Sequence, residues 1–407
     1  MIHIAVLGYG TVGSGVVEVL NTNQESINKK AGQEIKLKYV LDIRDFEGDP
    51  VQEVLVHDYD VILKDEDVKI IVEVMGGIEP AYTFVKQALL AGKSVVTSNK
   101  ELVAKYGAEL LEIAKKNKLN FLFEASVGGG IPIIRPLNSS LTADEITEIT
   151  GILNGTTNYI LTMMEEQGLD FDVVLKDAQE KGYAERNPEA DIEGHDACRK
   201  IAILTSLAFG MQVDYEDIHT EGITKITETD IKYAKSLHAS IKLIGTSVKE
   251  GDVVYSMVAP MMIDDKHPLI GVKDVFNGIF VHGNVLDNIM FYGRGAGKLP
   301  TASAVVSDVV DAAKHMHTNI MTIWSSKKLE LGDFGEAKHK FLVRLVDKGL
   351  DENQMFTIKE CFGNVLYINA EGVKGELAFI TEDIKECDFA EGIQKLEDVI
   401  HAIRVAF

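Results

Sequence analysis

Hydrophobic residues in the first third of the chain fall into short β-branched runs, and stretches with helical spacing separate these runs. The helical patterns are TVGSGVVEVLN, PAYTFVKQALLAG and ELVAKYGAELLEIAKKN. Strands with little polar alternation that are separated by helices are typical of a parallel sheet covered on both faces. We therefore expect a doubly wound α/β domain over residues 1–135. Its predicted strands are IHIAVL (2–7), IKLKYVLD (35–42), VKIIVEVM (68–75), KSVVTS (93–98) and LNFLFEAS (119–126).

The pattern changes after Pro136, where strands and helices no longer alternate regularly. EITEITGIL predicts a strand, and helices are expected near 156–167, near 171–181 and in the segment that leads into the apolar run IAILTSLAFG. IKLIGTSVKEGDVVYSMVAP and GIFVHGNVLDNIMFYG each predict two strands, the first pair joined at KEGD. Residues 136–322 are thus predicted to form an α+β domain with antiparallel pairing. Its last helix, LPTASAVVSDVVDAAKHM, is expected to pack back on the first domain.

The last part of the chain has its own pattern. SSKKLELGDFGEAKH is polar and contains glycine, so we expect a linker over residues 323–337. Beyond it, the segments KFLVRLVDK, NVLYINAEG, GELAFITED, FAEGIQKLED and VIHAIRVAF predict the element order βαββαβ. That order is typical of a small ferredoxin-like module, which is expected over residues 338–407.

Length and charge restrict the kinds of partner. The chain has 407 residues, which is too long for one ordinary core and suggests two or three domains. Its net charge of −22 argues against nucleic acid and anionic membranes as partners, because both require a basic face. An anionic ligand would have to be held by locally placed cations or backbone N–H groups.

Cysteine usage and the first residues predict a cytoplasmic protein. The three cysteines, Cys198, Cys361 and Cys387, stand far apart and suggest neither a disulfide framework nor a zinc site. The sequence enters its first predicted strand at once, without a basic region or a cleavage signal. No apolar run approaches the length that spans a bilayer.

A glycine-rich turn follows the first predicted strand and opens a predicted helix. Gly8, Gly10 and Gly13 form a G-x-G-x-x-G pattern in this context. Gly8 permits a tight turn, Gly10 lets the backbone approach a pyrophosphate, and Gly13 permits close packing of the helix on the sheet. The helix N-terminus would supply N–H donors to the phosphates. A glycine-rich turn without a ligand is the alternative, but the context favours a dinucleotide site in a Rossmann-type domain.

Two residues near the end of the second predicted strand give opposite indications for the cofactor. Asp42 can accept a hydrogen bond from a ribose 2′-OH, which favours NAD. Arg44 can pair with a 2′-phosphate, which favours NADP. We lean slightly towards NADP, and NAD stays open.

Seven segments occur in a fixed order along the first 320 or so residues. They are VEVMGGIEPA (72–81), TSNKEL (97–102), FEASVGGGIPIIRPL (123–137), GILNGTTNYILTMM (151–164), GYAERNPEADIEGHDACRKIAIL (182–204), EGITKIT (221–227) and GAGKLPTASAVVSDVVD (295–311). Together they resemble the homoserine dehydrogenase family. The resemblance implies NAD(P)-linked interconversion of L-homoserine and L-aspartate 4-semialdehyde, a step of threonine and methionine biosynthesis.

The resemblance also implies catalytic residues. Asp196 and Lys200 stand at i and i+4 of a predicted helix, and Glu185 lies eleven residues before Asp196. The family's two acids and lysine have this spacing, so Lys200 resembles the general acid/base, with Asp196 beside it. Lys100 is implied as a second cation that lies near the nicotinamide. Without the resemblance, a surface i,i+4 salt bridge worth a few tenths of a kcal/mol would be the simpler interpretation.

Substrate binding is implied for residues around this lysine. Glu185 would bind the ammonium of homoserine, and Asp191 and Asp196 would complete the polar pocket. Gly155 and Thr156, which open a predicted helix, would hold the substrate through N–H and hydroxyl donors. An ordinary helix N-cap is the alternative role for a threonine there.

Further positions are implied for the cofactor and for a cation. A monovalent cation, most simply sodium, would be held by Glu124 and the carbonyls of Val127, Gly129 and Ile131, although a glycine-rich turn without an ion is an equal alternative. The implied cofactor contacts are Gly8, Gly10, Thr11, Val12, Gly13, Arg44, Gly76, Lys100, Gly182 and Gly297.

The C-terminal module resembles the ACT domain found in many members of this family. By analogy it would bind an amino-acid effector such as threonine, and the protein would be a homodimer or homotetramer. The family's acidic-x-Pro-Gly turn is replaced here by VDKGLDENQMF, which lacks the proline. The module could therefore serve dimerisation alone.

Two other functions stay open at this point. One is a dehydrogenase for a related amino-acid semialdehyde or hydroxy acid. The other is a non-catalytic sensor of nucleotides or amino acids, although a sensor has no need of a proton-transfer set such as Lys200 with Asp196.

Overall fold

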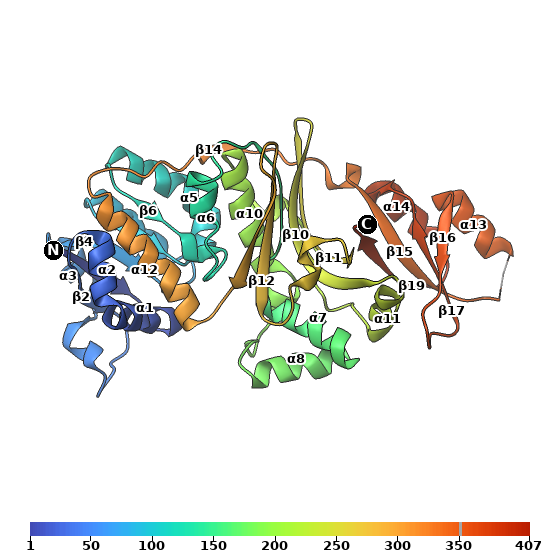
Figure 1. Cartoon of the computed structure of the whole chain (residues 1–407), viewed down its shortest axis with the longest axis horizontal. Helices are drawn as coiled ribbons and strands as arrows, with labels where there is room; N and C mark the ends of the chain where they lie inside the picture. The colour runs from blue at the N-terminus through green and yellow to red at the C-terminus, as the bar shows by residue number, and fades with distance from the viewer. Residues whose placement is uncertain (350–351) are drawn as a thin grey trace. The chain divides into compact units, whose positions relative to one another are not determined.

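The computed structural model describes residues 1–349 and 352–407, which divide into two compact units (Figure 1). Each unit combines segments that are distant in the sequence. The first comprises Met1–Ile146, Ala202–Tyr215 and Gly293–Leu329, and the second comprises Thr147–Ile201, Glu216–Tyr292 and Glu330–Phe407. The C-terminal residues expected to form a separate module are thus grouped with the second unit.

The first unit contains a parallel sheet of six strands in the order β3-β2-β1-β4-β5-β6. This order is that of a Rossmann-type doubly wound fold, which confirms the predicted fold class. The last strand is shorter than predicted because residues after Leu122 leave the sheet for a 3₁₀ turn at Glu124–Ser126. The strands are β1 Ile2–Leu7, β2 Ile35–Leu41, β3 Leu55–Val56, β4 Val68–Glu73, β5 Ser94–Thr97 and β6 Phe121–Leu122.

Helices accompany this sheet, including three predicted ones: α1 (Thr11–Thr22), α4 (Ala81–Leu90) and α5 (Lys100–Lys116). The predicted late helix is present as α12 (Lys298–Lys314), which lies beside α1 in Figure 1. A Cβ on Gly15 of α1 would lie 2.8 Å from the carbonyl oxygen of Lys298, so glycine lets the two helices approach closely. The shorter helices of this unit are α2 Gln24–Ala31, α3 Tyr59–Lys64 and α6 Ile134–Ser139.

The second unit is organised around a large mixed sheet with the main order β13-β12-β7-β10-β11-β19-β15-β17-β16. The hairpin β10–β11 is antiparallel along its whole length and turns at Gly251, as predicted. The strands are β7 Ile146–Ile152, β10 Ala239–Glu250, β11 Val253–Asp264, β12 Phe276–Gly283, β13 Asp287–Arg294, β15 Lys338–Val346, β16 Val365–Ile368, β17 Glu376–Thr381 and β19 Val399–Val405, with the two-residue strand β9 His219–Thr220 paired to β11.

Several helices of the second unit precede the hairpin in sequence. The segment Gly155–Gln167 forms α7, and the predicted helical segment that leads into IAILTSLAFG forms α9 and the start of α10. The remaining residues of α10, from Ala202, belong to the first unit. The helices are α7 Gly155–Gln167, α8 Phe171–Glu180, α9 Glu189–Ile192, α10 His195–Phe209 and α11 Glu228–Ser236.

The C-terminal module has the predicted element order βαββαβ. Two helices, α13 (Glu352–Phe362) and α14 (Glu386–Gln394), connect its strands, which lie in the order β19-β15-β17-β16. The module is not a separate sheet, because β19 also pairs in parallel with β11 at Met261–Arg404. Its core contains phenylalanines from different elements, with the rings of Phe341 and Phe389 stacked at 3.5 Å. Residues 350–351 of the altered turn VDKGLDENQMF lie outside the described residues.

Part of the expected linker forms a strand instead. β14 (Ser325–Lys328) pairs in parallel with β8 (Met211–Gln212) in the first unit. The polar composition of SSKK predicted no regular structure, and the pairing depends on a partner more than a hundred residues earlier. Local sequence therefore gave no signal for it.

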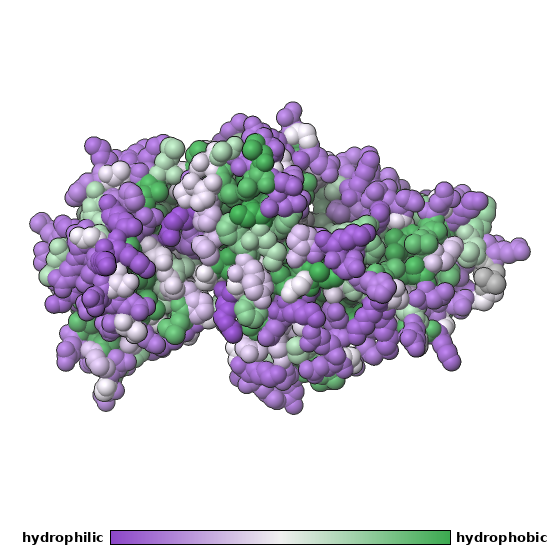
Figure 2. Space-filling view, in the orientation of Figure 1, coloured by the Kyte–Doolittle hydropathy of each residue, from purple (hydrophilic) through white to green (hydrophobic). Residues whose placement is uncertain are grey.

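The surface in Figure 2 is mainly hydrophilic, with a hydrophobic patch over the strands of the C-terminal module. Leu366 and Tyr367 of the edge strand β16 are exposed. Within the described ranges, no helix is long and apolar enough to cross a membrane.

Candidate functional site

The glycine-rich turn between β1 and α1 has the geometry of a phosphate-binding loop. Gly8 has φ +98°, a conformation that side-chain-bearing residues rarely adopt. A Cβ on Gly13 would lie 2.0 Å from the carbonyl oxygen of Gly8, so only glycine fits there. Gly10 has no neighbouring atom within 4 Å of the Cβ position, and its backbone is open to a close ligand. Thr11 and Val12 follow as the first residues of α1.

Asp42 and Arg44, which gave opposite indications for the cofactor, form a hydrogen-bonded ion pair with each other. Arg44 donates from Nε to Asp42 Oδ1 and from Nη2 to Asp42 Oδ2, both at 2.9 Å. The backbone N–H of Tyr9 also donates to Asp42 Oδ2 at 2.8 Å. The hydrogen bonds from Arg44 contribute most to holding the pKa of the Asp42 carboxyl well below its usual range. The Arg44 side chain is 57% exposed and can reach a ligand.

Polar residues that the sequence interpretation missed lie at the ends of β4 and β5. Glu73 is fully buried and accepts hydrogen bonds from Thr97 Oγ1 at 2.6 Å and from the N–H of Met75 at 2.8 Å. Burial raises the pKa of its carboxyl. Asn99 caps α5, which begins at Lys100, and donates to the carbonyl of Gly77. A lone glutamate inside the apolar run VKIIVEVM was the available signal.

Lys200 and Asp196 form a buried ion pair on α10. Lys200 Nζ donates to Asp196 Oδ2 at 2.7 Å and to the carbonyl of Leu153 at 2.8 Å. Their side chains are only 10% and 4% exposed. The pair is therefore not a surface salt bridge, which was the simpler interpretation of the i,i+4 spacing alone.

Asn154, which the sequence interpretation did not single out, connects two of the predicted carboxylates. Its Nδ2 donates to Asp191 Oδ1 at 2.7 Å and to Asp196 Oδ2 at 2.8 Å. Its Oδ1 accepts from the N–H of Thr157 at 2.9 Å and so caps α7. The structure thus brings Asp191, Asp196 and Lys200 into one cluster around a buried amide. The Asn-Gly-Thr-Thr run signalled a helix cap but not this bridge.

The other residues predicted to bind the substrate are Gly155, Thr156 and Glu185. They are close in sequence to the residues of this cluster, but their hydrogen bonds are to other groups. Gly155 begins α7, and Thr156 Oγ1 donates to the carbonyl of Tyr183 at 2.7 Å. Glu185 is exposed, and its carbonyl accepts from Gln179. Gly182, with φ +75°, stands before this exposed segment in the second unit. The remaining cofactor glycines, Gly76 and Gly297, also have positive φ and belong to the first unit.

The side chain of Glu124, which was implied as a cation ligand, accepts hydrogen bonds from backbone N–H groups. The carboxylate of Glu124 accepts from the N–H groups of Ile133, Ile134 and Arg135 at 2.6 to 2.8 Å. These N–H groups belong to the first turn of α6 and the residue before it, and they compensate the buried charge. The carbonyl-bearing residues Val127, Gly129 and Ile131 lie in the turn that follows Glu124. Among the described residues, no cluster of three or more His, Cys, Asp or Glu side chains has the arrangement of a metal site.

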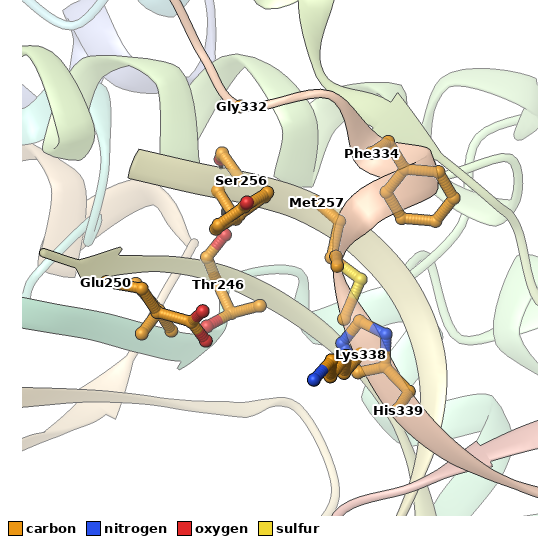
Figure 3. A pocket seen from close by; sticks show the side chains of 11 residues that line it. Thr246, Glu250, Ser256, Met257, Gly332, Phe334, Lys338 and His339 are labelled. Carbon is orange, nitrogen blue, oxygen red and sulfur yellow. Dashed lines mark hydrogen bonds between the residues drawn. The ribbon is translucent and has the colours of Figure 1, made fainter. Parts of the chain in front are cut away.

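A cavity of about 210 Å³ lies elsewhere in the second unit, between the β10–β11 hairpin and residues 332–339 (Figure 3). Ser256 and Met257 line one side, and Phe334, Lys338 and His339 line another. None of the predicted site residues lines this cavity. It is therefore distinct from the Lys200 cluster.

Comparison with known proteins decides the family. The homoserine dehydrogenase family model matches residues 132–310, and the model of the family's NAD-binding domain matches residues 8–124. The chain belongs to the homoserine dehydrogenase family. The predicted class, a nicotinamide-linked oxidoreductase that acts on a CH–OH group, is thereby confirmed, and the related dehydrogenase and the sensor are not favoured.

Individual relatives agree over most of the chain. The homoserine dehydrogenase of Bacillus subtilis is 38% identical, and the match covers 98% of this chain and 95% of the relative. That of Synechocystis is 47% identical over 76% of this chain and 73% of its own. The crystal structure of a homoserine dehydrogenase from Thiobacillus denitrificans has a TM-score of 0.89 and 34% identity, and covers 100% of this chain and 98% of its own. A hyperthermophilic archaeal homoserine dehydrogenase in complex with NADPH has a TM-score of 0.65 and 29% identity, and covers 76% and 97%.

Proposed function

We propose that Lys200 is the proton donor when the chain reduces L-aspartate 4-semialdehyde to L-homoserine, and the proton acceptor in the reverse reaction. A bound nicotinamide cofactor supplies or accepts the hydride. Reduction of an aldehyde places negative charge on its oxygen, which a neighbouring N–H donor can stabilise and protonate. An ammonium has three N–H donors, and described residues accept two of those of Lys200. The third can serve the substrate oxygen, and this observation carries the proposal.

Substrate recognition is proposed for the acidic residues near Lys200. Asp191 and Glu185 would bind the ammonium of homoserine, with Asp196 keeping the lysine in position. The carboxylate of the substrate would lie at the N-terminus of α7, where the backbone N–H groups of Gly155 and Thr156 come first. Glu185 is exposed, so its carboxylate is accessible to a substrate.

Asn154 is proposed as a positioning residue for this reaction. Its amide has two N–H bonds, and each is committed to one carboxylate. This arrangement keeps the two like charges apart and holds Asp196 Oδ2 towards Lys200 Nζ. It thereby orients the lysine without touching the reacting atoms.

For the cofactor, we propose NADP rather than NAD. A ribose 2′-OH would have to compete with Arg44 for the oxygens of Asp42, which already accept four hydrogen bonds. A 2′-phosphate would instead draw the exposed Arg44 guanidinium towards itself. The open space beside Gly10 would accommodate the pyrophosphate. The proposed contacts are Gly8, Gly10, Thr11, Val12, Gly13, Arg44, Gly76, Lys100, Gly182 and Gly297, with Lys100 also proposed as a catalytic cation.

A monovalent cation is proposed at the turn after Glu124. Backbone carbonyls of Val127, Gly129 and Ile131 are hard oxygen ligands, which suit sodium. The Glu124 carboxylate already accepts three N–H groups, so it can add only a remaining lone pair. The cation would fix this turn. Replacing sodium with choline chloride in the assay tests the proposal, and an unchanged rate and unfolding midpoint contradict it.

We further propose that the protein is a homodimer or homotetramer. Both edge strands of the large sheet, β13 and β16, carry exposed apolar side chains, among them Tyr292 and Leu366. Such edges are templates for pairing with another chain. Light scattering after gel filtration measures the mass, and a monomer at micromolar concentration contradicts this proposal.

Two expectations about regulation and location are retained as proposals. The C-terminal module is proposed to be an ACT domain that binds an amino acid such as threonine, and the observed βαββαβ order supports this. A cytoplasmic location is proposed from the cysteine usage. Isothermal titration with L-threonine and cell fractionation test the two in turn.

The decisive experiment is nicotinamide absorbance on addition of L-homoserine with NADP⁺ or NAD⁺ at alkaline pH. We expect reduction of the cofactor with L-homoserine and none with D-homoserine, which is the matched control for the ammonium and carboxylate contacts. A higher kcat/KM with NADP⁺ is expected. No reduction of either cofactor would overturn the proposed reaction, and a preference for NAD⁺ would overturn only the cofactor proposal.

A further inference from the structure

A buried arginine of the C-terminal module holds a loop that lies outside the module. Arg404 of β19 donates from Nη1 and Nη2 to the two carboxylate oxygens of Glu221, both at 2.9 Å. The same guanidinium donates to both oxygens of Glu386, the first residue of α14, at 2.6 and 2.9 Å. Arg404 is 6% exposed. A bidentate arginine–carboxylate pair of this kind fixes orientation as well as distance.

The loop that Arg404 holds is packed tightly against the turn that carries Asp191. A Cβ on Gly222 would lie 2.3 Å from the carbonyl oxygen of Ile192, so the two backbones are in direct contact. The N–H of Ile223 donates to that same carbonyl at 2.8 Å. From the other side, a Cβ on Gly194 would lie 3.2 Å from the carbonyl oxygen of Glu221. Loop and turn therefore cannot shift independently.

The turn connects directly to the cluster around Lys200. Asp191 precedes Ile192 and accepts a hydrogen bond from Asn154, while α10 begins at His195, just after Gly194. A displacement of Glu221 would thus be passed to Asp191 and to the start of the helix that bears Asp196 and Lys200.

The boundary between the loop and β19 combines these polar contacts with a cavity. A cavity of about 220 Å³ lies along the same boundary, lined by residues 220–226 of the loop and by 401–404 of β19. Protein interiors are normally filled, so the contacts from Arg404 bridge a boundary that is not closely packed along its whole length. Both family models end before the C-terminal module, the later one at residue 310. The contact from Arg404 is therefore an addition to the part of the chain that those models describe.

We propose that Arg404 is a positioning residue for substrate binding: through Glu221 and Gly222 it fixes the turn of Asp191, so that the C-terminal module sets the affinity for the substrate ammonium. The inference rests on the proposed role of Asp191 in binding homoserine. A change in the module that draws β19 away from the loop would raise KM for the amino acid. It would leave the cofactor-binding turn at Gly8 unaffected.

The first test compares two glutamates that each pair with a buried arginine of the module. Glu221→Gln removes the charge that Arg404 holds. Glu376→Gln, on β17, removes one of the two carboxylates that pair with Arg344 of β15, the other being Asp230, and Glu376 does not contact residues 220–226. We expect Glu221→Gln to raise KM for L-homoserine about five-fold, with kcat and KM for NADP⁺ nearly unchanged. Glu376→Gln should leave all three constants near those of the wild type. Equal KM values for the wild type and Glu221→Gln would overturn the inference.

A double-mutant cycle gives the second test. If Arg404 acts through Asp191, then adding Glu221→Gln to Asp191→Asn should produce no further rise in KM for L-homoserine. Multiplicative effects of the two substitutions would instead show independent action and overturn the inference. Arg404→Lys, which keeps the charge but loses the bidentate geometry, should give a smaller rise than Arg404→Met.

The outcomes separate this inference from the proposed function. Failure of the wild-type protein to oxidise L-homoserine would overturn the proposed reaction and with it this inference. Normal wild-type turnover, combined with an unchanged KM in Glu221→Gln, would overturn the role of Arg404 alone. A lower unfolding midpoint in Glu221→Gln without a change in KM would mean that Arg404 only stabilises the fold, which also contradicts the proposal.

Discussion

Two Asp–Lys pairs with the same i,i+4 spacing lie within 25 residues of each other in the second unit. Asp177 and Lys181 meet at 2.9 Å at the end of α8, and Asp196 and Lys200 meet at 2.7 Å on α10. The first pair is about half exposed and also contacts the hydroxyl of Tyr159. The second is almost completely buried and shares its carboxylate with Asn154.

The difference shows that spacing places two side chains on one face of a helix and says nothing about what that face meets. A solvent-exposed pair is screened and contributes little, whereas a buried pair keeps its full electrostatic effect on whatever binds beside it. The surroundings of α10, which come from distant parts of the sequence, turn the second pair into a candidate proton-transfer group. The following substitutions are chosen to test this contrast, starting with the largest expected effect.

Replacing each lysine with methionine tests the contrast in catalysis. Lys200→Met should lower kcat for homoserine oxidation by about 10² to 10⁴, the usual contribution of a general acid or base. Lys181→Met should change kcat by less than about three-fold, because an exposed pair contributes little. Initial rates of NADP⁺ reduction measure both. A similar loss in the two variants, or a Lys200→Met enzyme that retains most of its activity, would remove the basis for the assignment.

Replacing each aspartate with asparagine tests the contrast in stability. Asp196→Asn leaves a buried ammonium without its counter-ion and should lower the free energy of unfolding by about 3 kcal/mol. Asp177→Asn should leave the urea midpoint at the wild-type value, since both partners face solvent. Equilibrium urea unfolding followed by circular dichroism gives both quantities. If the midpoints of the two variants coincide, burial is not what distinguishes the pairs.

Asn154→Ser tests whether the amide bridge makes the buried pair functional. Serine keeps a side-chain oxygen that can cap α7 but loses both N–H donors, so helix stability should change little. We expect kcat/KM for L-homoserine to fall about ten-fold, which corresponds to about 1.4 kcal/mol. Asn154→Asp, which also keeps the cap but adds a third negative charge, should be worse. Wild-type kinetics in the serine variant would show that the bridge has no role in positioning.

A third lysine extends the comparison to a buried ammonium that forms no salt bridge with a carboxylate of the described residues. Lys242 of β10 donates to Asn158 Oδ1 and to the carbonyl of Val272, and burial lowers its pKa to about 8. Its pKa in the unfolded chain is near the ordinary value, so the unfolded chain binds more protons between the two values, and stability should rise with pH through this window. Relative to Lys242→Met, the wild-type protein should gain about 1 kcal/mol of unfolding free energy from pH 7 to pH 9. A pH-independent difference in urea unfolding would contradict the lowered pKa.

The elements that were predicted correctly are those whose sequence pattern lies entirely within the element itself. The strands β1, β2, β4 and β5 are rich in β-branched and other apolar residues, and the turn at Gly8 is marked by its glycines. The helix α2 was missed because it is polar, with only Ile27 and Ala31 buried. The strand β14 was missed because its partner β8 lies far away in sequence. A local sequence pattern indicates the secondary-structure propensity of a segment and which of its faces is apolar. The formation of α2 and β14 depends instead on tertiary contacts.

The candidate site shows the same division. Family motifs indicated Lys200, Asp196 and Asp191, and the structure gathers them into one cluster. The role of Asn154 in that cluster was not predictable, because a helix-capping asparagine has the same sequence signal whether or not its amide reaches two carboxylates. Glu73 was overlooked because a single glutamate in an apolar run gives no indication of its partners, Thr97 and Met75.

The place of β19 in the sheet also determines when the second unit can finish folding in the cell. Residues 399–405 are synthesised after both β11 and β15, yet the strand they form lies between these two strands in the interior of the sheet. Until they leave the ribosome, the facing edges of those two strands stay open, and open edges pair readily with other chains. We therefore expect nascent chains of this protein to require protection by chaperones until β19 has been synthesised.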